Sequence, residues 1–166
     1  MRYRRNYVVG GCYFFTVVTA GRRPWLGKAR HVDLLRAAFR NVRSRHPFAI
    51  EAMVVLPDHL HAIWTLPPAD GDYSLRWRLI KSDVSRRIGS VKRLWQPRFW
   101  EHTIRDEIDF TRHMDYIHYN PVKHGLAAAP YEWPHSSFAH CVRQGHYLPD
   151  WGRAGPPNIP AGVGHE

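Results

Sequence analysis

Apolar positions along the chain recur with two different periods, and the shorter period predicts β-strands. Side chains of a strand alternate between its two faces, and β-branched and aromatic residues favour this conformation. Three stretches have this composition: residues 8–19, 48–56 and 60–66. Gly10 and Gly11 predict a bulge or bend within the first. Pro57 and Asp58 predict a turn between the second and the third, which would then form a hairpin.

The longer period, about 3.6 residues, predicts helices. Apolar residues recur at this spacing in three stretches: residues 31–45, 74–89 and 106–120. Asp106 suits the N-cap of the last helix, and Pro121, which lacks a backbone N–H, is expected to end it. Weaker patterns predict a loop or an edge strand over residues 95–103 and a short helix over residues 134–142.

The resulting order of elements, β-α-β-β-α-(β)-α, predicts an α+β fold of ferredoxin-like type. The central hairpin favours an antiparallel sheet, and we expect the helices to pack mainly on one of its faces. A chain of 166 residues with 44% hydrophobic residues suits one domain, which we place at residues 1–148. Residues 149–166 are rich in Gly and Pro with little apolar pattern, so we expect an irregular or mobile tail.

Composition narrows the functional classes. No apolar run approaches the roughly 20 residues that a membrane span needs, and the N-terminus does not resemble a signal peptide. The two cysteines, Cys12 and Cys141, indicate neither a disulfide scaffold nor a zinc site, which favours a cytoplasmic protein. The net charge of +10 with neutral histidines favours a polyanionic partner.

A pair of histidines opens the second strand of the predicted hairpin. His59 and His61 are two residues apart, so they point to the same face, with Cα atoms about 7 Å apart. Two imidazoles at that distance can bind one metal ion. The motif is short and the chain contains 12 histidines, so a pair of half-exposed surface histidines is the alternative interpretation.

The last long helix carries a second pair of polar residues. Tyr116 and Asn120 are four positions apart and therefore share one helix face. The Asn120 amide oxygen is a hard ligand suited to Mg²⁺ or Mn²⁺. A tyrosine with a solvated hydroxyl is the plainer interpretation of Tyr116. Tyr119 is the alternative nucleophile, but Lys123 rather than an amide follows it at four positions.

Cations and aromatic residues alternate between residues 74 and 100, as expected for a groove that binds single-stranded nucleic acid. A solvated basic helix face with buried tryptophans is the alternative. The basic arm from Arg2 to Arg5 adds further cations. The predicted contacts are Arg4, Arg5, Arg76, Trp77, Arg78, Lys81, Trp95 and Arg98.

Three motifs together resemble the REP-associated tyrosine transposases, which belong to the single-tyrosine branch of the HUH endonucleases. The resemblance extends from about Tyr3 to about Trp151, with the motifs in the family's order and at similar spacing. The motifs are VVLPD followed by His59-Leu60-His61, then WQPRFWEHTI, then DYIHYNPVKHG.

The resemblance implies a metal-dependent enzyme that cuts and rejoins single-stranded DNA with hairpin elements of the REP type. It implies that Tyr116 is the nucleophile, forming a 5′-phosphotyrosine, and that His59 and His61 bind Mg²⁺ or Mn²⁺. Asn120 would be the third ligand, where the wider superfamily often has Gln. A nucleoid-associated monomer or weak homodimer is expected. Separately, because the tail lacks a core pattern, we expect it to cover the site when no DNA is bound.

Two other functions remain open on the same residues. The first is a non-catalytic protein that binds single-stranded DNA or RNA, with structural histidines. The second is a metal-dependent phosphodiesterase that uses water, with Tyr116 only packing. The first predicts binding that chelators do not affect, and the second predicts a free 5′-phosphate with no protein-linked strand.

Overall fold

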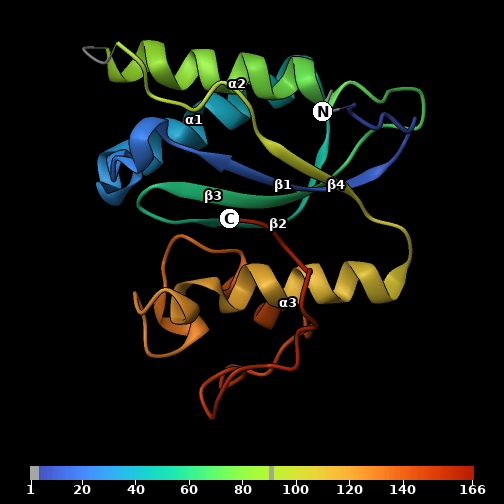
Figure 1. Cartoon of the computed structure of the whole chain (residues 1–166), viewed down its shortest axis with the longest axis vertical. Helices are drawn as coiled ribbons and strands as arrows, with labels where there is room; N and C mark the ends of the chain where they lie inside the picture. Colours follow the sequence, from blue (N-terminus) through green and yellow to red (C-terminus); the bar gives the residue numbers. More distant parts are fainter. Residues whose placement is uncertain (1–3, 90–91) are drawn as a thin grey trace.

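The computed structural model describes residues 4–89 and 92–166, and an antiparallel sheet lies at its centre (Figure 1). The strand order is β2-β3-β1-β4, in which β2 and β3 form the predicted hairpin. This arrangement confirms the predicted α+β class. The strands are β1 (Cys12–Val18), β2 (Ala49–Val55), β3 (His59–Thr65) and β4 (Trp100–Thr103).

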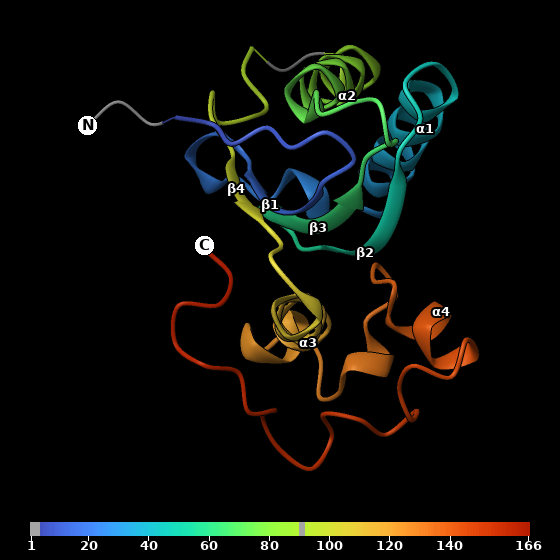
Figure 2. The same ribbon diagram turned by 90° about the vertical axis from the view of Figure 1, so that its right-hand side faces the viewer.

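The helices lie on both faces of the sheet rather than mainly on one (Figure 2). Helices α1 and α2 cover one face, while α3 and α4 lie on the other side. None of the described helices has the length and apolarity that crossing a bilayer requires. The helices are α1 (Ala29–Arg45), α2 (Tyr73–Ile88), α3 (Glu107–Lys123) and α4 (Phe138–Arg143), with short 3-10 turns η1 (Ala20–Arg22), η2 (Trp25–Gly27) and η3 (Pro130–Glu132).

The reason for two helical layers is that both faces of the central strands are apolar. On β1, Phe15 faces the hydrophobic cluster under α1 and α2, whereas its neighbour Phe14 faces the cluster under α3. On β3, Trp64 and Ile63 divide in the same way. Because alternate residues point to opposite faces, each face exposes apolar area that needs a helical cover. The expectation of helices mainly on one face was therefore wrong.

The first strand is shorter than predicted. Residues 8–11 form a turn in which Gly10 adopts a φ of 68° and donates its N–H to Asp70 O. Val8 and Val9 are exposed despite their strand propensity. The strand begins only at Cys12, where pairing with β3 starts. The predicted bend at the two glycines is thus present, but it precedes the strand instead of interrupting it.

Pro121 does not end the last long helix, contrary to prediction, because α3 continues to Lys123. The missing N–H removes one helical hydrogen bond near the end, while the fixed φ of proline suits helical backbone. His124 caps the helix by donating its backbone N–H to Asn120 O. As a result, Lys123 and His124 lie one turn beyond Asn120, and the His124 ring is 5.3 Å from the ring of His59 on β3.

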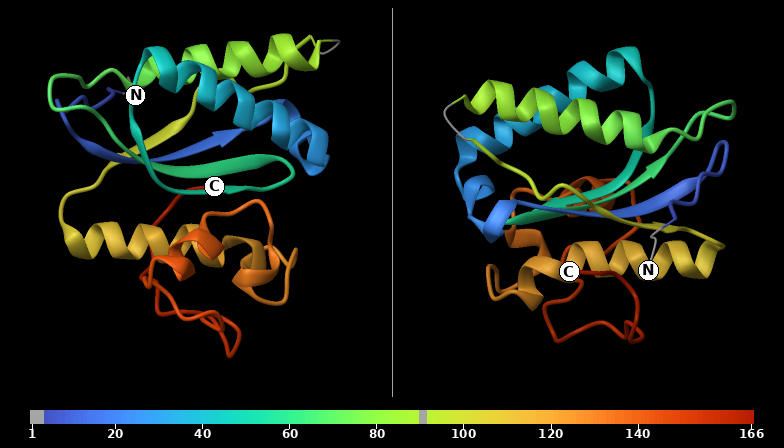
Figure 3. Two further views of the ribbon diagram at one scale, coloured as in Figure 1. Left: turned by 180° about the vertical axis from the view of Figure 1, so that it is seen from behind. Right: turned by 45° about the horizontal axis from the view of Figure 1, so that its top comes forward.

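The outer elements and the tail complete the fold. Residues 100–103 form an edge strand on β1, and α4 lies within the predicted short helix. The tail contains neither helix nor strand over residues 149–166, as expected, yet it is packed. Ile159 and Val163 contact the cluster under α3, and Trp151 packs on Phe138. Figure 3 shows the tail passing beneath α3 and returning to the sheet.

Candidate functional site

The two histidines of β3 point toward α3 and are held in fixed orientations. His59 is 2% exposed and His61 is fully buried. His59 Nδ1–H donates to Asp58 Oδ1 at 2.7 Å. His61 Nδ1 lies 2.8 Å from Thr16 Oγ1, whose hydroxyl donates to the carbonyl of His165, so His61 Nδ1–H is the donor. Both rings therefore carry their lone pair on Nε2.

Those two Nε2 atoms are buried and have no hydrogen-bond partner. The ring centroids of His59 and His61 are 4.9 Å apart. Burial lowers the pKa of His61 to about 4 and also lowers the pKa of His59, so both rings are neutral near pH 7. A metal-binding histidine is typically neutral, with an unpaired lone pair on one ring nitrogen. Its other ring nitrogen is typically hydrogen-bonded to a carboxylate or a hydroxyl.

The helix α3 brings Tyr116 and Asn120 to the same place. Tyr116 is 6% exposed, and its ring lies 5.2 Å from the ring of His61. Asn120 is fully buried, and its Oδ1 atom has no hydrogen-bond partner. The phenol from a late helix and the imidazoles from the mid-chain hairpin thus meet within one chain. No second copy of the chain is needed to complete this arrangement.

The donor set fits a divalent cation. An unpartnered buried polar atom is costly, and this site holds three: Nε2 of His59, Nε2 of His61 and Oδ1 of Asn120. Two imidazole nitrogens and one amide oxygen suit ions such as Mg²⁺, Mn²⁺ or Zn²⁺ and leave coordination positions for further oxygens. We take these three atoms as the candidate ligands.

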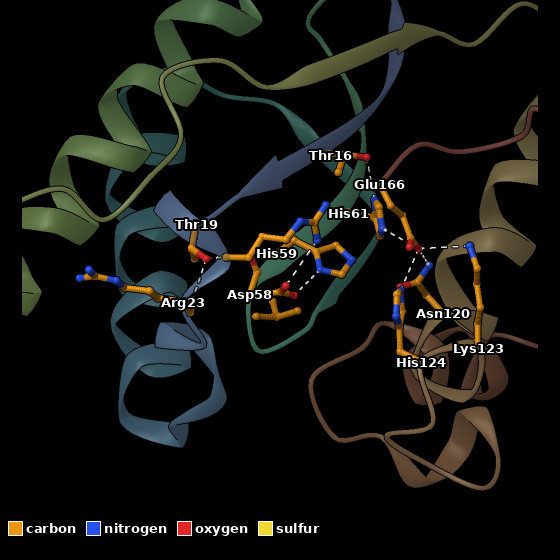
Figure 4. Close-up of polar contacts among 12 residues, drawn as sticks. Thr16, Thr19, Arg23, Asp58, His59, His61, Asn120, Lys123, His124 and Glu166 are labelled. Atoms are coloured by element: carbon orange, nitrogen blue, oxygen red, sulfur yellow. Dashed lines mark hydrogen bonds and ion pairs between the residues drawn. The ribbon is translucent and has the colours of Figure 1, made fainter.

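Glu166, from the tail, lies between the strand and the helix (Figure 4). Its Oε1 accepts hydrogen bonds from Tyr116 Oη at 2.9 Å, Asn120 Nδ2 at 3.0 Å and His124 Nε2 at 2.9 Å. Lys123 Nζ is 3.3 Å away, and His61 Nε2 is 3.9 Å away, too far for a hydrogen bond. One carboxylate oxygen therefore occupies the point where the candidate residues converge.

The Glu166 carboxylate and the Tyr116 hydroxyl shift each other's proton affinity. Burial opposes the charged form of Glu166, but the neighbouring His61 and the hydrogen bonds from Asn120, His124 and Tyr116 outweigh it and lower the pKa of this carboxyl far below its usual range. Burial and the adjacent Glu166 raise the pKa of Tyr116 well above its usual range. With the tail docked, Tyr116 is a neutral phenol and a poor nucleophile.

The residues before Glu166 fit closely against the same site. The His165 ring stacks on Trp100 of β4 with centroids 4.3 Å apart and planes 12° apart. Gly164 lies against the Tyr116 ring, where any Cβ would overlap it, and adopts a φ of 75°. Only glycine suits both conditions. Gly164 and Glu166 thus contact the candidate nucleophile, and His165 anchors the segment between them.

Several residues predicted to contact DNA are buried. Arg76 is 1% exposed and binds Asp70 together with the carbonyl oxygens of His46, Pro47 and Asp72. Two aromatic residues predicted to contact DNA are buried as well. Trp77 is fully buried in the core, and Trp95 is 6% exposed. We therefore exclude these three residues from the candidate DNA surface, in agreement with the alternative interpretation given above.

The remaining predicted contacts differ in accessibility. Lys81 donates to Gln96 O at 2.8 Å, which makes it a link between α2 and the following loop. Arg5 is half-buried, bridging Glu101 at 2.8 Å and lying over the Phe99 ring. Arg2 lies outside the described residues. Three predicted cations are exposed: Arg4, Arg78 and Arg98.

Sequence reasoning missed five members of the site. They are Thr16, Asp58, Lys123, His124 and Glu166. His124 was detectable in principle, because positions 116, 120 and 124 follow one face of a helix once α3 is allowed to pass Pro121. His59, His124 and Glu166 each offer a ligand atom within 4.8 Å of the others. Thr16 and Glu166 carried no local signal, since sheet register and tail packing place them.

No protein-family model matches the chain. A REP-associated tyrosine transposase of Escherichia coli (strain K12) is 48% identical over 149 residues, covering 90% of this chain and 89% of the relative. A Haemophilus influenzae relative with the same family name is 38% identical over 164 residues, covering 90% and 92%.

A solved structure of a REP-associated tyrosine transposase bound to a REP hairpin matches the whole fold. The TM-score is 0.90 at 43% identity, and the match covers 100% of this chain and 98% of that one. Identity at this level over nearly the full length of each chain confirms the resemblance seen in the three motifs. The family implies a divalent metal, which agrees with the three unpartnered donor atoms. The chain belongs to the REP-associated tyrosine transposases.

Proposed function

We propose that this protein is a transposase that cuts and rejoins single-stranded DNA at hairpin elements of the REP type. The observation that carries the proposal is the convergence of the Tyr116 hydroxyl with three buried, unpartnered donor atoms from β3 and α3. The family relationship and the relative bound to a REP hairpin support the same substrate class.

Tyr116 is the proposed nucleophile. Its oxygen forms a bond to the phosphorus of the scissile phosphate as the bond from phosphorus to the 3′ oxygen breaks. The products are a 5′-phosphotyrosine and a free 3′-hydroxyl; the phenol releases its proton to solvent and the 3′ oxygen gains one. Attack by a 3′-hydroxyl on the phosphotyrosine reverses the step, so rejoining needs no ATP.

His59, His61 and Asn120 are the proposed ligands of Mg²⁺ or Mn²⁺. When bound, such an ion stabilises the negative charge that develops on the phosphate oxygens. Asp58 and Thr16 hold the two imidazoles with Nε2 toward the site. Lys123 and His124, which now bind the Glu166 carboxylate, would contact a phosphate at the same point.

The docked tail is incompatible with this reaction as it stands. Glu166 accepts the hydrogen bond of the Tyr116 hydroxyl and raises the pKa of that group, so the tail must leave before attack. We therefore propose that residues 164–166 cover the site in the absence of DNA. The exposed cations Arg4, Arg78 and Arg98 are the remaining candidates for DNA contact, together with the half-buried Arg5.

The whole candidate site lies in one chain, which supports action as a monomer. A dimer that exchanged catalytic residues would have its tyrosine and histidines apart within each chain. Here His61 and Tyr116 are in ring contact in the same chain. Measurement of molecular mass in solution, with and without a hairpin oligonucleotide, tests this part of the proposal.

Formation of a covalent adduct tests the reaction. The purified chain is incubated with Mn²⁺ and a single-stranded hairpin oligonucleotide of REP type, labelled at its 3′ end, and the products are separated under denaturing conditions. We expect a protein-linked strand that Tyr116→Phe abolishes and EDTA prevents. Tyr119→Phe is the matched control, because Tyr119 lies on the same helix and packs on Trp151 instead.

Two results would replace the proposal with another function. Release of a free 5′-phosphate without any protein-linked strand would favour a phosphodiesterase that uses water. DNA binding without any cleavage, unchanged by EDTA and by His59→Ala, would favour a non-catalytic single-strand binding protein.

A further inference from the structure

His165 and Glu166, at the end of the tail, present a ring and a negative charge in the way a nucleotide presents its base and its phosphate. The His165 side chain is a flat heteroaromatic ring stacked on the Trp100 indole, 4.3 Å away and nearly parallel. The adjacent Glu166 side chain is an anion bound by Tyr116, Asn120 and His124. A base next to a phosphate offers the same two features, a planar ring and a negative charge at neighbouring positions.

The surroundings of Trp100 suit a nucleotide as well. A cavity of about 320 Å³ lies beside the docked residues, between the end of β1 and the loop that leads to β4. Two arginines and one amide line it, together with the indole. The lining residues that the argument uses are Thr16, Arg22, Gln96, Arg98 and Trp100.

Of Trp77, Trp95 and Trp100, Trp100 is the one that solvent can reach. Trp77 and Trp95 are buried in the core, whereas Trp100 is 38% exposed on the edge strand β4. Its indole face is turned toward the site, since His165 stacks on it while Glu166 reaches Tyr116. An aromatic face beside a cluster of phosphate-binding donors is what recognition of an unpaired base requires.

We propose that Trp100 is the stacking platform for the base next to the scissile phosphate. In the DNA complex this base takes the place of the His165 ring, and the scissile phosphate takes the place of the Glu166 carboxylate. Arg98 and Arg22 then lie where the strand continues along the cavity. The inference rests on the proposed function, because it assumes that Tyr116 attacks a phosphate held at the position of Glu166.

The test separates base stacking from tail docking. All proteins carry Tyr116→Phe to prevent cleavage and His165→Gly to remove the ring that competes for the indole. Hairpin oligonucleotides contain a single abasic site at successive positions around the scissile phosphate, and affinity is measured for each. Trp100→Leu removes the platform, Trp100→Phe conserves an aromatic face, and Tyr131→Leu removes an exposed aromatic residue outside the site.

We expect one position beside the scissile phosphate at which loss of the base weakens binding about 5- to 150-fold in the background protein. In the Trp100→Leu protein the same abasic site should have no further effect, while Trp100→Phe should restore most of the difference. A 2-aminopurine at that position should be quenched on binding, and less so in Trp100→Leu. The Tyr131→Leu protein should behave as the background.

Equal effects of the abasic site in the Trp100→Leu and background proteins would overturn the inference. So would unchanged quenching of 2-aminopurine at every position in Trp100→Leu. The adduct assay with unmodified Tyr116 is read separately. An adduct without any coupling to Trp100 leaves the proposed function intact and removes only the platform, whereas absence of the adduct removes the proposed function itself.

Discussion

At the scale of single residues, the neighbours of the two histidines decide their chemistry as much as the histidines do. Asp58 and Thr16 occupy the Nδ1 positions, which leaves both Nε2 atoms facing the site. The spacing of His59 and His61 was enough to predict that they share a face. Their tautomers were not predictable, because Thr16 comes from β1 and reaches His61 only through the sheet register.

Thr16→Val tests this orienting role. The substitution keeps the shape of the side chain but leaves Nδ1 of the buried His61 without its acceptor. We expect affinity for Mn²⁺ to fall by about 10- to 100-fold, as is typical when a partner of a metal ligand is lost. Isothermal titration with Mn²⁺ measures the change, and Thr65→Val on the far end of β3 is the control. Equal affinities in both variants would contradict the role.

The predicted DNA contacts show that local sequence does not determine which side chains are accessible. Arg76 and Arg78 are two positions apart on α2 and equally basic, yet the first is buried on three backbone carbonyls and the second is exposed. Which face of α2 meets the sheet depends on packing with α1 and β1. Charge and aromatic content therefore indicated nucleic acid correctly as a class, but they did not separate the buried residues from the accessible ones.

At the scale of elements, the observed structure goes furthest beyond the sequence prediction in the tail. Its composition predicted irregular backbone, and that is observed. The anchoring residues Ile159 and Val163 are isolated apolar positions among glycines and prolines, too few to produce a periodic pattern. Their burial nevertheless brings Gly164, His165 and Glu166 onto the site.

Glu166→Gln tests the effect of the docked tail on activity. The substitution removes the charge that Lys123, His124 and Tyr116 stabilise, and neutral hydrogen bonds are weaker than charge-assisted ones. We expect the rate of adduct formation to rise about tenfold, because a larger fraction of molecules is open. Glu51→Gln, at an exposed position on β2, is the control. A rate no higher than that of the control would contradict tail inhibition.

The junction between β4 and α3 depends on one carboxylate. Asp109 accepts hydrogen bonds from the Arg105 N–H at 2.9 Å and from His102 at 2.8 Å. His113 lies 3.2 Å from its other oxygen, but the rings of His102 and His113 are stacked nearly parallel, which does not suit a shared metal ion. Asp106 is the N-cap of α3, as predicted, and accepts the Asp109 N–H at 2.7 Å. We interpret the group around Asp109 as a structural link that fixes where α3 starts and hence where Tyr116 lies.

Asp109→Asn tests this structural link through its dependence on pH. Burial opposes the charged form of Asp109, but the hydrogen bonds from Arg105 and His102 outweigh it and lower its pKa in the folded state. The stabilisation is therefore present above the unfolded pKa of about 4 and is lost as pH falls below it.

We expect Asp109→Asn to reduce the free energy of unfolding by about 1–2 kcal/mol at pH 7 and by less below pH 4. Urea denaturation at both pH values measures the two differences. The exposed Asp33 gives a matched variant, Asp33→Asn, with little expected effect. A difference that stays constant down to pH 3 would show that the negative charge is not what stabilises the junction.

At the scale of the whole molecule, the site lies on the α3 side of the sheet, beside the second hydrophobic cluster, to which Tyr116 belongs. The sheet with α1 and α2 forms one cluster, and α3 with the tail and the other sheet face forms the second. The order of strands and helices was predictable, since each has a clear period. The second helical layer was not, because near-continuous apolar strands such as β1 and β3 do not reveal which helix covers which face.

The charge of the molecule predicts how binding depends on salt. With a net charge of +10, most of the affinity for single-stranded DNA should come from release of counterions. We expect Arg98→Ala to reduce the magnitude of the slope of log affinity against log salt by about 0.7, the value for one phosphate contact on a single strand. Fluorescence anisotropy over a range of NaCl concentrations measures the slope.

Arg153→Ala is the control for this measurement. Arg153 lies in the tail and is also exposed, but it pairs with Glu132 of η3. Its slope should equal that of the unmodified protein. Equal slopes for Arg98→Ala and the unmodified protein would place Arg98 outside the DNA path.

The Glu166 carboxylate that blocks Tyr116 belongs to the same chain, so the degree of inhibition does not depend on the amount of protein. The local concentration of a tethered inhibitor is set by the length and stiffness of its connection, not by the number of molecules in solution. Overproduction or dilution of the protein would leave the open fraction unchanged. Only a competing ligand shifts that fraction, so the rate of strand transfer per molecule would follow the supply of unpaired DNA rather than the level of expression.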